Sequence, residues 1–139
     1  MKQVRFYIED LYHGLYDMLK KNITENVFVE HRPSGLDYQM SDFVIVSLPA
    51  NIVDQRVYQH SIVRFEIAAR NKQSGIANTA KLQSMLDKLV GLFPIQFDRF
   101  VLTSPSLLFK GDDENSFTIW LIQADLVVNT TDRLSNESK

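Results

Sequence analysis

The hydrophobic positions of this chain change their spacing in an order that predicts its architecture. Apolar residues recur at three- and four-residue steps over residues 3–21 and then alternate in three short runs. They return to helical spacing up to residue 93 and alternate again in two longer runs. Helical spacing places apolar side chains on one face of a helix, whereas alternation places them on one face of a strand. The order predicts an α+β fold, a mostly antiparallel sheet of about five strands with two helices packed on one face.

Both predicted helices are amphipathic. The first is expected over residues 3–21, with an apolar stripe made of Val4, Ile8, Leu11, Leu15, Met18 and Leu19. Gly14 weakens this helix by about 1 kcal/mol relative to alanine, and Asn22 is expected to cap its end. The second helix follows residues 71–75 and ends at Pro94, because proline cannot continue a helix. Its stripe consists of Leu82, Met85, Leu86, Leu89, Leu92 and Phe93.

Five segments are expected to form strands, at residues 27–30, 42–48, 58–69, 100–109 and 117–128. The second strand is almost entirely apolar, which predicts burial on both of its faces. The third alternates, which predicts one buried face and one solvent-exposed face. It is expected to pair antiparallel with the second. The fourth is expected to be irregular at Pro105, because proline cannot donate a hydrogen bond to a neighbouring strand. Residues 50–57 are expected to form a loop, and residues 110–115 a polar hairpin turn.

Length and composition indicate one globular domain. The chain has 139 residues, of which 45% are hydrophobic, and it contains no internal repeat. Residues 1–129 are expected to form the domain, and the polar residues 130–139 a flexible C-terminal tail. A net charge of −2 without a basic stripe argues against sequence readout of nucleic acid. No apolar stretch approaches the roughly 18 residues that cross a bilayer, so we expect an intracellular protein without a membrane partner.

The residue types that carry catalysis or bind metals are sparse. There is no cysteine, which excludes disulfides and thiolate chemistry. The histidines at positions 13, 31 and 60 lie outside the spacings of metal motifs. Asp112, Asp113, Glu114 and Asn115 lack the alternating spacing of a calcium loop and are interpreted as a solvated hairpin tip. If several chains brought such tips together, they would offer a weak cation site. We therefore expect no cofactor, no metal and no catalytic residue.

Two regions carry apolar or aromatic residues of the kind found at protein interfaces. Tyr12 and Tyr16 lie four residues apart, hence on one side of the first helix. They are interpreted either as part of a wide stripe buried under the chain's own sheet or as a subunit interface, where tyrosine is enriched. The loop region adds further candidates for an interface or a clamp on a partner, namely Ile52, Val53, Arg56, Val57 and Tyr58.

The order of these segments and their pattern of apolar and polar residues resemble those of the tail-terminator and head–tail joining (neck) proteins of tailed bacteriophages. The similar segments are IEDLYHGLYDML (residues 8–19), VFVEHRP (27–33), FVIVSLP (43–49), IVRFEIAAR (62–70) and LVGLFP (89–94), followed by a closing β-hairpin. The resemblance implies a structural subunit that forms a homo-oligomer, commonly a hexameric ring. Such a ring caps the tail tube, contacts the connector and belongs to the virion. The chain departs from the family in its polar tail after Val128 and in its long 50–57 loop.

Two other functions stay open from the residues alone. One is a non-viral binding or adaptor module with the same scaffold, as a monomer or dimer. The other is a small enzyme whose site uses strand carboxylates, with Glu66 and Asp125 facing each other as a pair. The apolar loop residues favour assembly over catalysis, and the absence of glycine-rich loops, cysteine and paired histidines disfavours an enzyme.

Overall fold

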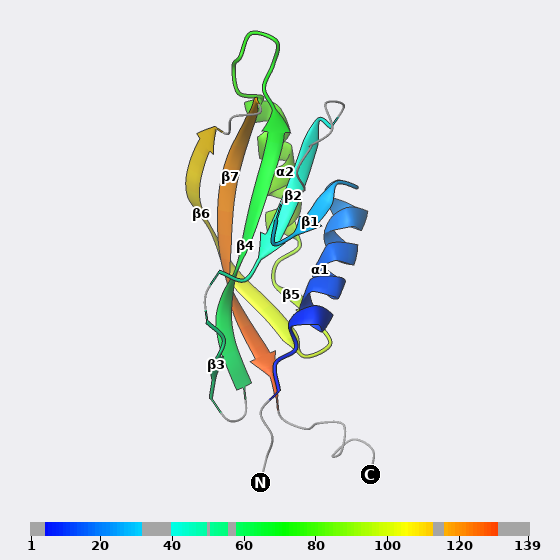
Figure 1. The fold of residues 1–139 in the computed structure, drawn as a ribbon, viewed down its shortest axis with the longest axis vertical. Coiled ribbons are helices and arrows are strands. Elements are labelled where there is room, and N and C mark those ends of the chain that lie inside the picture. The colour runs from blue at the N-terminus through cyan, green and yellow to red at the C-terminus, as the bar shows by residue number, and fades with distance from the viewer. Residues whose placement is uncertain (1–4, 32–39, 50, 56–57, 113–115, 131–139) are drawn as a thin grey trace.

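The computed structural model describes residues 5–31, 40–49, 51–55, 58–112 and 116–130. Within these residues the chain forms two helices and one large twisted sheet, which is an α+β fold (Figure 1). The helices are α1 (Ile8–Asn22) and α2 (Thr79–Gly91). The strands are β1 (Val27–Val29), β2 (Asp42–Ser47), β3 (Val53–Asp54), β4 (Tyr58–Arg70), β5 (Ile95–Phe97), β6 (Phe100–Asp112) and β7 (Phe117–Asn129).

The described strands pair in the order β1-β2-β4-β7-β6-β5, and β3 pairs with β4 beside this path. The pairing of β1 with β2 is parallel, and every other pair is antiparallel. The expected pairing of the second and third predicted strands is confirmed, because β2 runs antiparallel to residues 64–69 of β4. The five predicted strands are all present, and the structure adds the short strands β3 and β5.

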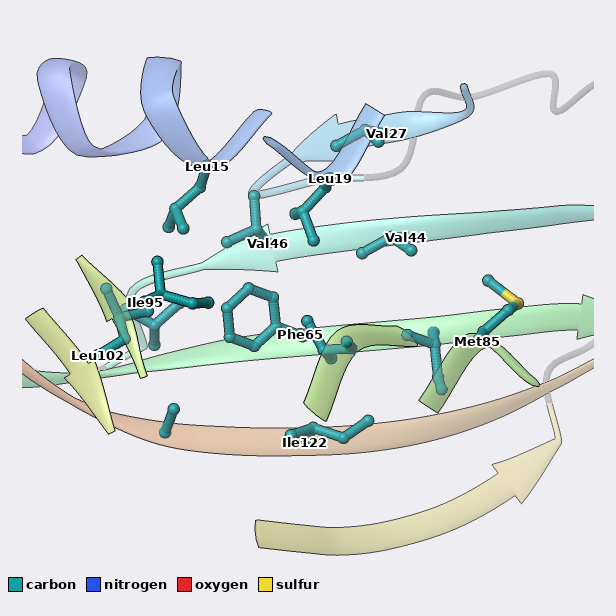
Figure 2. Packing of buried hydrophobic residues seen from close by; sticks show 14 of the residues in the cluster. Leu15, Leu19, Val27, Val44, Val46, Phe65, Met85, Ile95, Leu102 and Ile122 are labelled. Carbon is teal, nitrogen blue, oxygen red and sulfur yellow. The ribbon is translucent and has the colours of Figure 1, made fainter. Parts of the chain in front are cut away.

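Both helices cover the same face of the sheet, as predicted. Leu11, Leu15 and Leu19 of α1 join one buried cluster with Leu82, Met85 and Leu89 of α2. Figure 2 shows Leu15 and Leu19 directed toward Val46 and Phe65 of the sheet. Alternate residues of β4 and β7 belong to this cluster, including Phe65 and Ile122, and residues of β1, β2, β5 and β6 join it. Burial of this apolar surface is the main term that stabilises the layered fold.

The opposite face of the sheet carries a second, smaller cluster at one end. It consists of Phe43, Ile45, Ala68 and Phe117, with Phe28, Met40 and Ile119 packed against them. Because Phe43 and Ile45 belong to this cluster while Val44 and Val46 belong to the main one, β2 is buried on both faces. The prediction from its uninterrupted apolar run is confirmed.

The first helix begins later than its periodicity predicts. Helix α1 starts at Ile8 rather than residue 3, and Tyr7 precedes it with φ −111° and ψ 47°. Ile8 was expected in the buried stripe but is 42% exposed, so this assignment is wrong. It lies one helical turn before Leu11 and is not among the residues that pack against the main core. Asn22 is the last helical residue, and its amide donates to the Met18 carbonyl oxygen at 2.8 Å.

The region expected to be a loop at residues 50–57 contains the short strand β3. Val53 pairs with His60 and Asp54 with Gln59, so β3 and the start of β4 form a narrow hairpin. A strand of two residues is too short to show an alternating hydrophobic pattern, so the sequence could not predict β3. Only its pairing with β4 defines it. Residues 50, 56 and 57 lie outside the described residues.

The fourth predicted strand is irregular where proline was expected to disrupt it. The register between β6 and β7 shifts between Thr103 and Ser106, on either side of Pro105. Ser104 has a φ of 57°, in the left-handed region. Strand β6 continues to Asp112, and residues 113–115 of the predicted hairpin turn lie outside the described residues.

Candidate functional site

A groove of about 600 Å³ opens between the start of α1 and strand β3. It is lined by Phe6, Ile8, Tyr12, Glu30, Leu48, Asn51, Ile52 and Val53. Three of its apolar side chains reach solvent to an unusual extent, since Phe6 is 47%, Ile8 42% and Val53 42% exposed. We call this surface the apolar groove.

The groove follows from the different lengths of the strands beside it. Strand β4 has 13 residues, but β2 pairs only with its second half and β3 only with its first residues. The chain therefore leaves the sheet after Ser47 and rejoins β4 further along. The segment between β2 and β3 contributes Leu48, Asn51 and Ile52 to the lining of the groove. The first turn of α1 and the preceding Phe6 form the opposite wall.

One part of the apolar groove is polar and carries a negative charge. The hydroxyl of Tyr12 accepts a hydrogen bond from the Leu48 backbone N–H at 3.0 Å and donates one to the Glu30 side chain. Burial raises the pKa of Tyr12 to about 12, and the bond to Glu30 adds to the rise. Both effects favour the neutral phenol, because a phenolate would be desolvated and would face a carboxylate.

The structure brings together three of the residues predicted to form an interface. Tyr12, Ile52 and Val53 all line the apolar groove although they come from α1 and from the segment that leads into β3. Tyr58 lies outside it, at the start of β4, where it is 40% exposed and its ring centroid lies 6.3 Å from that of His60. The predicted interface residues Arg56 and Val57 lie outside the described residues.

Tyr16 does not line the groove. Its ring packs against the main core, and its hydroxyl accepts a hydrogen bond of 3.4 Å from the Lys20 ammonium. Although Tyr12 and Tyr16 lie four residues apart on one side of the helix, Tyr12 lines the groove and Tyr16 lies at the edge of the core.

Sequence reasoning missed most of the groove's lining. Phe6 and Ile8 were assigned to the helix, and Leu48 to the end of a strand, while Glu30 and Asn51 carried no assignment as interface residues. Only the tertiary arrangement joins Glu30 to Tyr12 across 18 positions of sequence. The available signal was the pair of aromatic residues Phe6 and Tyr7, which precede the first buried leucine.

The carboxylates considered as a catalytic pair do not face each other. In the antiparallel register Glu66 lies opposite Leu121, and Asp125 lies opposite Ile62. The two carboxylates are thus offset along the strands by four residues, about 13 Å at the usual rise per residue. The interpretation of Glu66 and Asp125 as a cross-strand pair is wrong, because the register of β4 and β7 separates them.

The polar side chains of the described residues do not assemble into a recognisable metal site. No group of three His, Asp or Glu side chains among the described residues has the arrangement that a metal ion requires. His13 is exposed and lies 3.4 Å from Asp17, while His31 and His60 are exposed on separate elements. Asp112 accepts a hydrogen bond from Thr118 at 3.1 Å, and its predicted companions Asp113, Glu114 and Asn115 lie outside the described residues.

A second, smaller cleft of about 310 Å³ lies beside α1. It is lined by Glu9, Asp10, His13, Gly14 and Asp98. Acidic side chains in the first turn of a helix are stabilised by the helix dipole, so Glu9 and Asp10 have a structural explanation.

In the part of the chain that the structure describes, neither helix combines the length and apolar character needed to cross a bilayer. No protein-family model matches this sequence, and a search of curated proteins found no match.

Proposed function

We propose that this chain is a structural assembly subunit that associates with copies of itself through the apolar groove. The observation that carries the proposal is the exposure of Phe6, Ile8 and Val53 around one concave surface. Single apolar side chains on a surface need no explanation, whereas a contiguous apolar patch with a polar rim is typical of an interaction site. A stable interface would bury roughly 1,200–2,000 Å², of which the groove would be the centre.

We further propose that the assembly acts in a phage tail, as a terminator or neck ring. This proposal is supported by the resemblance described from the sequence, which rests on the order of the predicted helices and strands. In this role the ring, hexameric by analogy, would contact the tail-tube and connector proteins. It would assemble in the host cytoplasm and remain in the virion. Flanking genes for major tail, portal or tape-measure proteins would support this assignment.

The first experiment measures the native mass of the chain over a wide range of concentrations. Light scattering on a sizing column and sedimentation equilibrium should give a mass that rises to a closed multiple of the subunit. Concentrations up to about 1 mM reveal contacts as weak as a Kd of about 1 mM. Negative-stain images should then show rings of uniform size. A mass that stays monomeric throughout this range would overturn self-association.

A matched pair of variants tests whether the groove is the contact. Val53→Asp places a charge in the groove and should abolish association while leaving the circular dichroism spectrum unchanged. Leu108→Asp is the control, because Leu108 is 50% exposed on β6 and does not line the groove. Equal association of the two variants would contradict the proposal.

The adaptor function differs from this proposal in what occupies the groove. A monomeric parent chain whose groove binds a different protein would favour the adaptor. The test above therefore separates the two functions by native mass, before any partner is known.

A further inference from the structure

The loop between β4 and α2 presents an apolar side chain next to a cation. Ile76 is 64% exposed, the highest exposure of any large hydrophobic residue among those described. The turn that carries it is closed by two backbone hydrogen bonds of 2.8 Å, from Lys72 N–H to the Ile76 carbonyl oxygen and from Gly75 N–H to the Lys72 carbonyl oxygen. We call residues 72–76 the apolar turn.

Glycine at position 75 allows the turn to keep this shape. Its φ is 84°, in the left-handed region that favours glycine, and no atom beyond its neighbours lies within 4 Å of the place of a Cβ. The turn is therefore closed by its own backbone hydrogen bonds. It belongs to the loop between β4 and α2, which protrudes at one end of the molecule (Figure 1).

The apolar turn and the apolar groove complement each other in polarity and charge. The groove offers apolar walls and the Glu30 carboxylate, and the turn offers an isoleucine and the Lys72 ammonium. Both charged side chains are exposed, and neither forms an ion pair with another residue in the described ranges. A contact between the two surfaces would join an apolar group to an apolar cleft and a cation to a carboxylate.

The two surfaces lie at different ends of the subunit. In Figure 1 the turn stands above the sheet at the end where β4 finishes, whereas the start of α1 and β3 lie in the lower half. A surface cannot therefore meet its complement within one chain. A contact between unlike surfaces of identical chains is heterologous, and it generates a ring when the rotation closes.

We infer that the apolar turn of one copy of this chain occupies the apolar groove of the next. The inference rests on the proposed function and names the occupant of its interface. Ile76 would enter between Phe6, Ile8 and Val53, and Lys72 would pair with Glu30 of the neighbouring copy.

The test mixes two variants that each lack one surface. Ile76→Asp disrupts the binding surface of the turn and leaves the groove intact. Val53→Asp disrupts the binding surface of the groove and leaves the turn intact. Each variant alone should be monomeric in sedimentation velocity. An equimolar mixture should form a dimer with one copy of each, because only one intact turn and one intact groove meet. Labelling one variant with ¹⁵N lets native mass spectrometry verify the 1:1 composition.

A charge exchange tests the pairing of Lys72 with Glu30. Lys72→Glu and Glu30→Lys should each weaken association by about threefold to tenfold, as expected for reversal of an exposed ion pair. The double variant carries both changes in one chain and should regain the affinity of the parent. Failure of the double variant to recover would overturn this pairing.

The outcomes distinguish the inference from the proposed function. If Val53→Asp is monomeric but Ile76→Asp associates like the parent, the groove is an interface and the turn is not its occupant. If both are monomeric but their mixture forms no dimer, the contact is not heterologous, and the inference is wrong. If Val53→Asp associates like the parent, the proposed function itself is wrong. Circular dichroism and thermal melting of Ile76→Asp should match the parent, because the side chain is exposed.

Discussion

At the scale of single residues, the hydroxyl of Tyr12 links the apolar groove to the fold. It accepts the Leu48 N–H bond and donates to Glu30, so Tyr12→Phe should lower the free energy of unfolding by about 1 kcal/mol at pH 7. The pKa of about 12 in the folded chain exceeds the ordinary value of 10.0. Tyr12 therefore stabilises the fold fully below pH 10, and this contribution is lost as the pH rises through 12.

Urea unfolding of the parent and Tyr12→Phe at several pH values checks this prediction. The difference in stability should shrink between pH 10 and pH 12, because other alkaline titrations are common to both chains. Tyr16→Phe is the control at pH 7, since the Tyr16 hydroxyl makes only a 3.4 Å bond to Lys20 within the described residues. A difference that stays constant up to pH 12 would show that Tyr12 ionises equally in both states.

Gly14 illustrates a residue whose role the sequence suggests incorrectly. Glycine within a helix costs about 1 kcal/mol relative to alanine, so alanine would be expected to stabilise α1. However, a Cβ at position 14 would lie 2.2 Å from Phe97 Cε2, because the β5 side chain rests directly on the helix backbone. Gly14→Ala should therefore reduce the free energy of unfolding by about 1–3 kcal/mol through overpacking.

Thermal and urea unfolding of a double-mutant cycle test the contact. In a Phe97→Ala background the same Gly14→Ala change should become neutral or stabilising. Gly91→Ala is the matched control, because a Cβ at Gly91 of α2 meets no atom within 4 Å. Stabilisation by Gly14→Ala in the parent would mean that Phe97 moves aside at little cost.

At the scale of elements, the burial of α2 on the sheet predicts an asymmetry between two neighbouring residues. Leu89 is fully buried in the main core, whereas Val90 is 43% exposed. Leu89→Ala should destabilise the chain by about 2–5 kcal/mol, the range for a leucine deleted from a packed core. Val90→Ala should stay within about 0.5 kcal/mol of the parent. Urea unfolding of both variants measures the difference, and similar losses would show that the helix packs through another face.

Periodicity predicts the elements that bury a full face, and it fails for those that do not. The stripe of Leu11, Leu15 and Leu19 was sufficient to identify α1, and the alternation of β4 and β7 identified both faces of the central sheet. Strands β3 and β5 have two and three residues, too short for a period, and their partners define them. Ile8 follows the helical period but lies beyond the core, so its spacing could not reveal its exposure.

The same distinction explains how much of the groove could be predicted. Tyr12, Ile52 and Val53 could be recognised as candidate interface residues, because they are aromatic or apolar and lie outside a predicted core stripe. Glu30 and Leu48 were not, because their roles depend on two hydrogen bonds to Tyr12 that join distant segments.

At the scale of the whole molecule, self-association and stability are linked. If only folded copies associate, raising the concentration stabilises the folded state by mass action, by about 2.7 kcal/mol when the free copies are at a hundredfold excess over Kd. A chain of 139 residues should then gain about 5–10 °C in Tm as the concentration of free copies rises from Kd to a hundred times Kd. The gain depends on the contact rather than on the fold of the single chain.

Scanning calorimetry of the parent over this range measures the gain, under conditions in which repeated scans superimpose. Val53→Asp should melt at a temperature independent of concentration, because its groove no longer binds a neighbour. Leu108→Asp should keep the dependence of the parent, since Leu108 lies on β6 and does not line the groove. A concentration dependence in all three chains would place the contact elsewhere on the surface. Its absence in all three would mean that the folded chain does not assemble by itself.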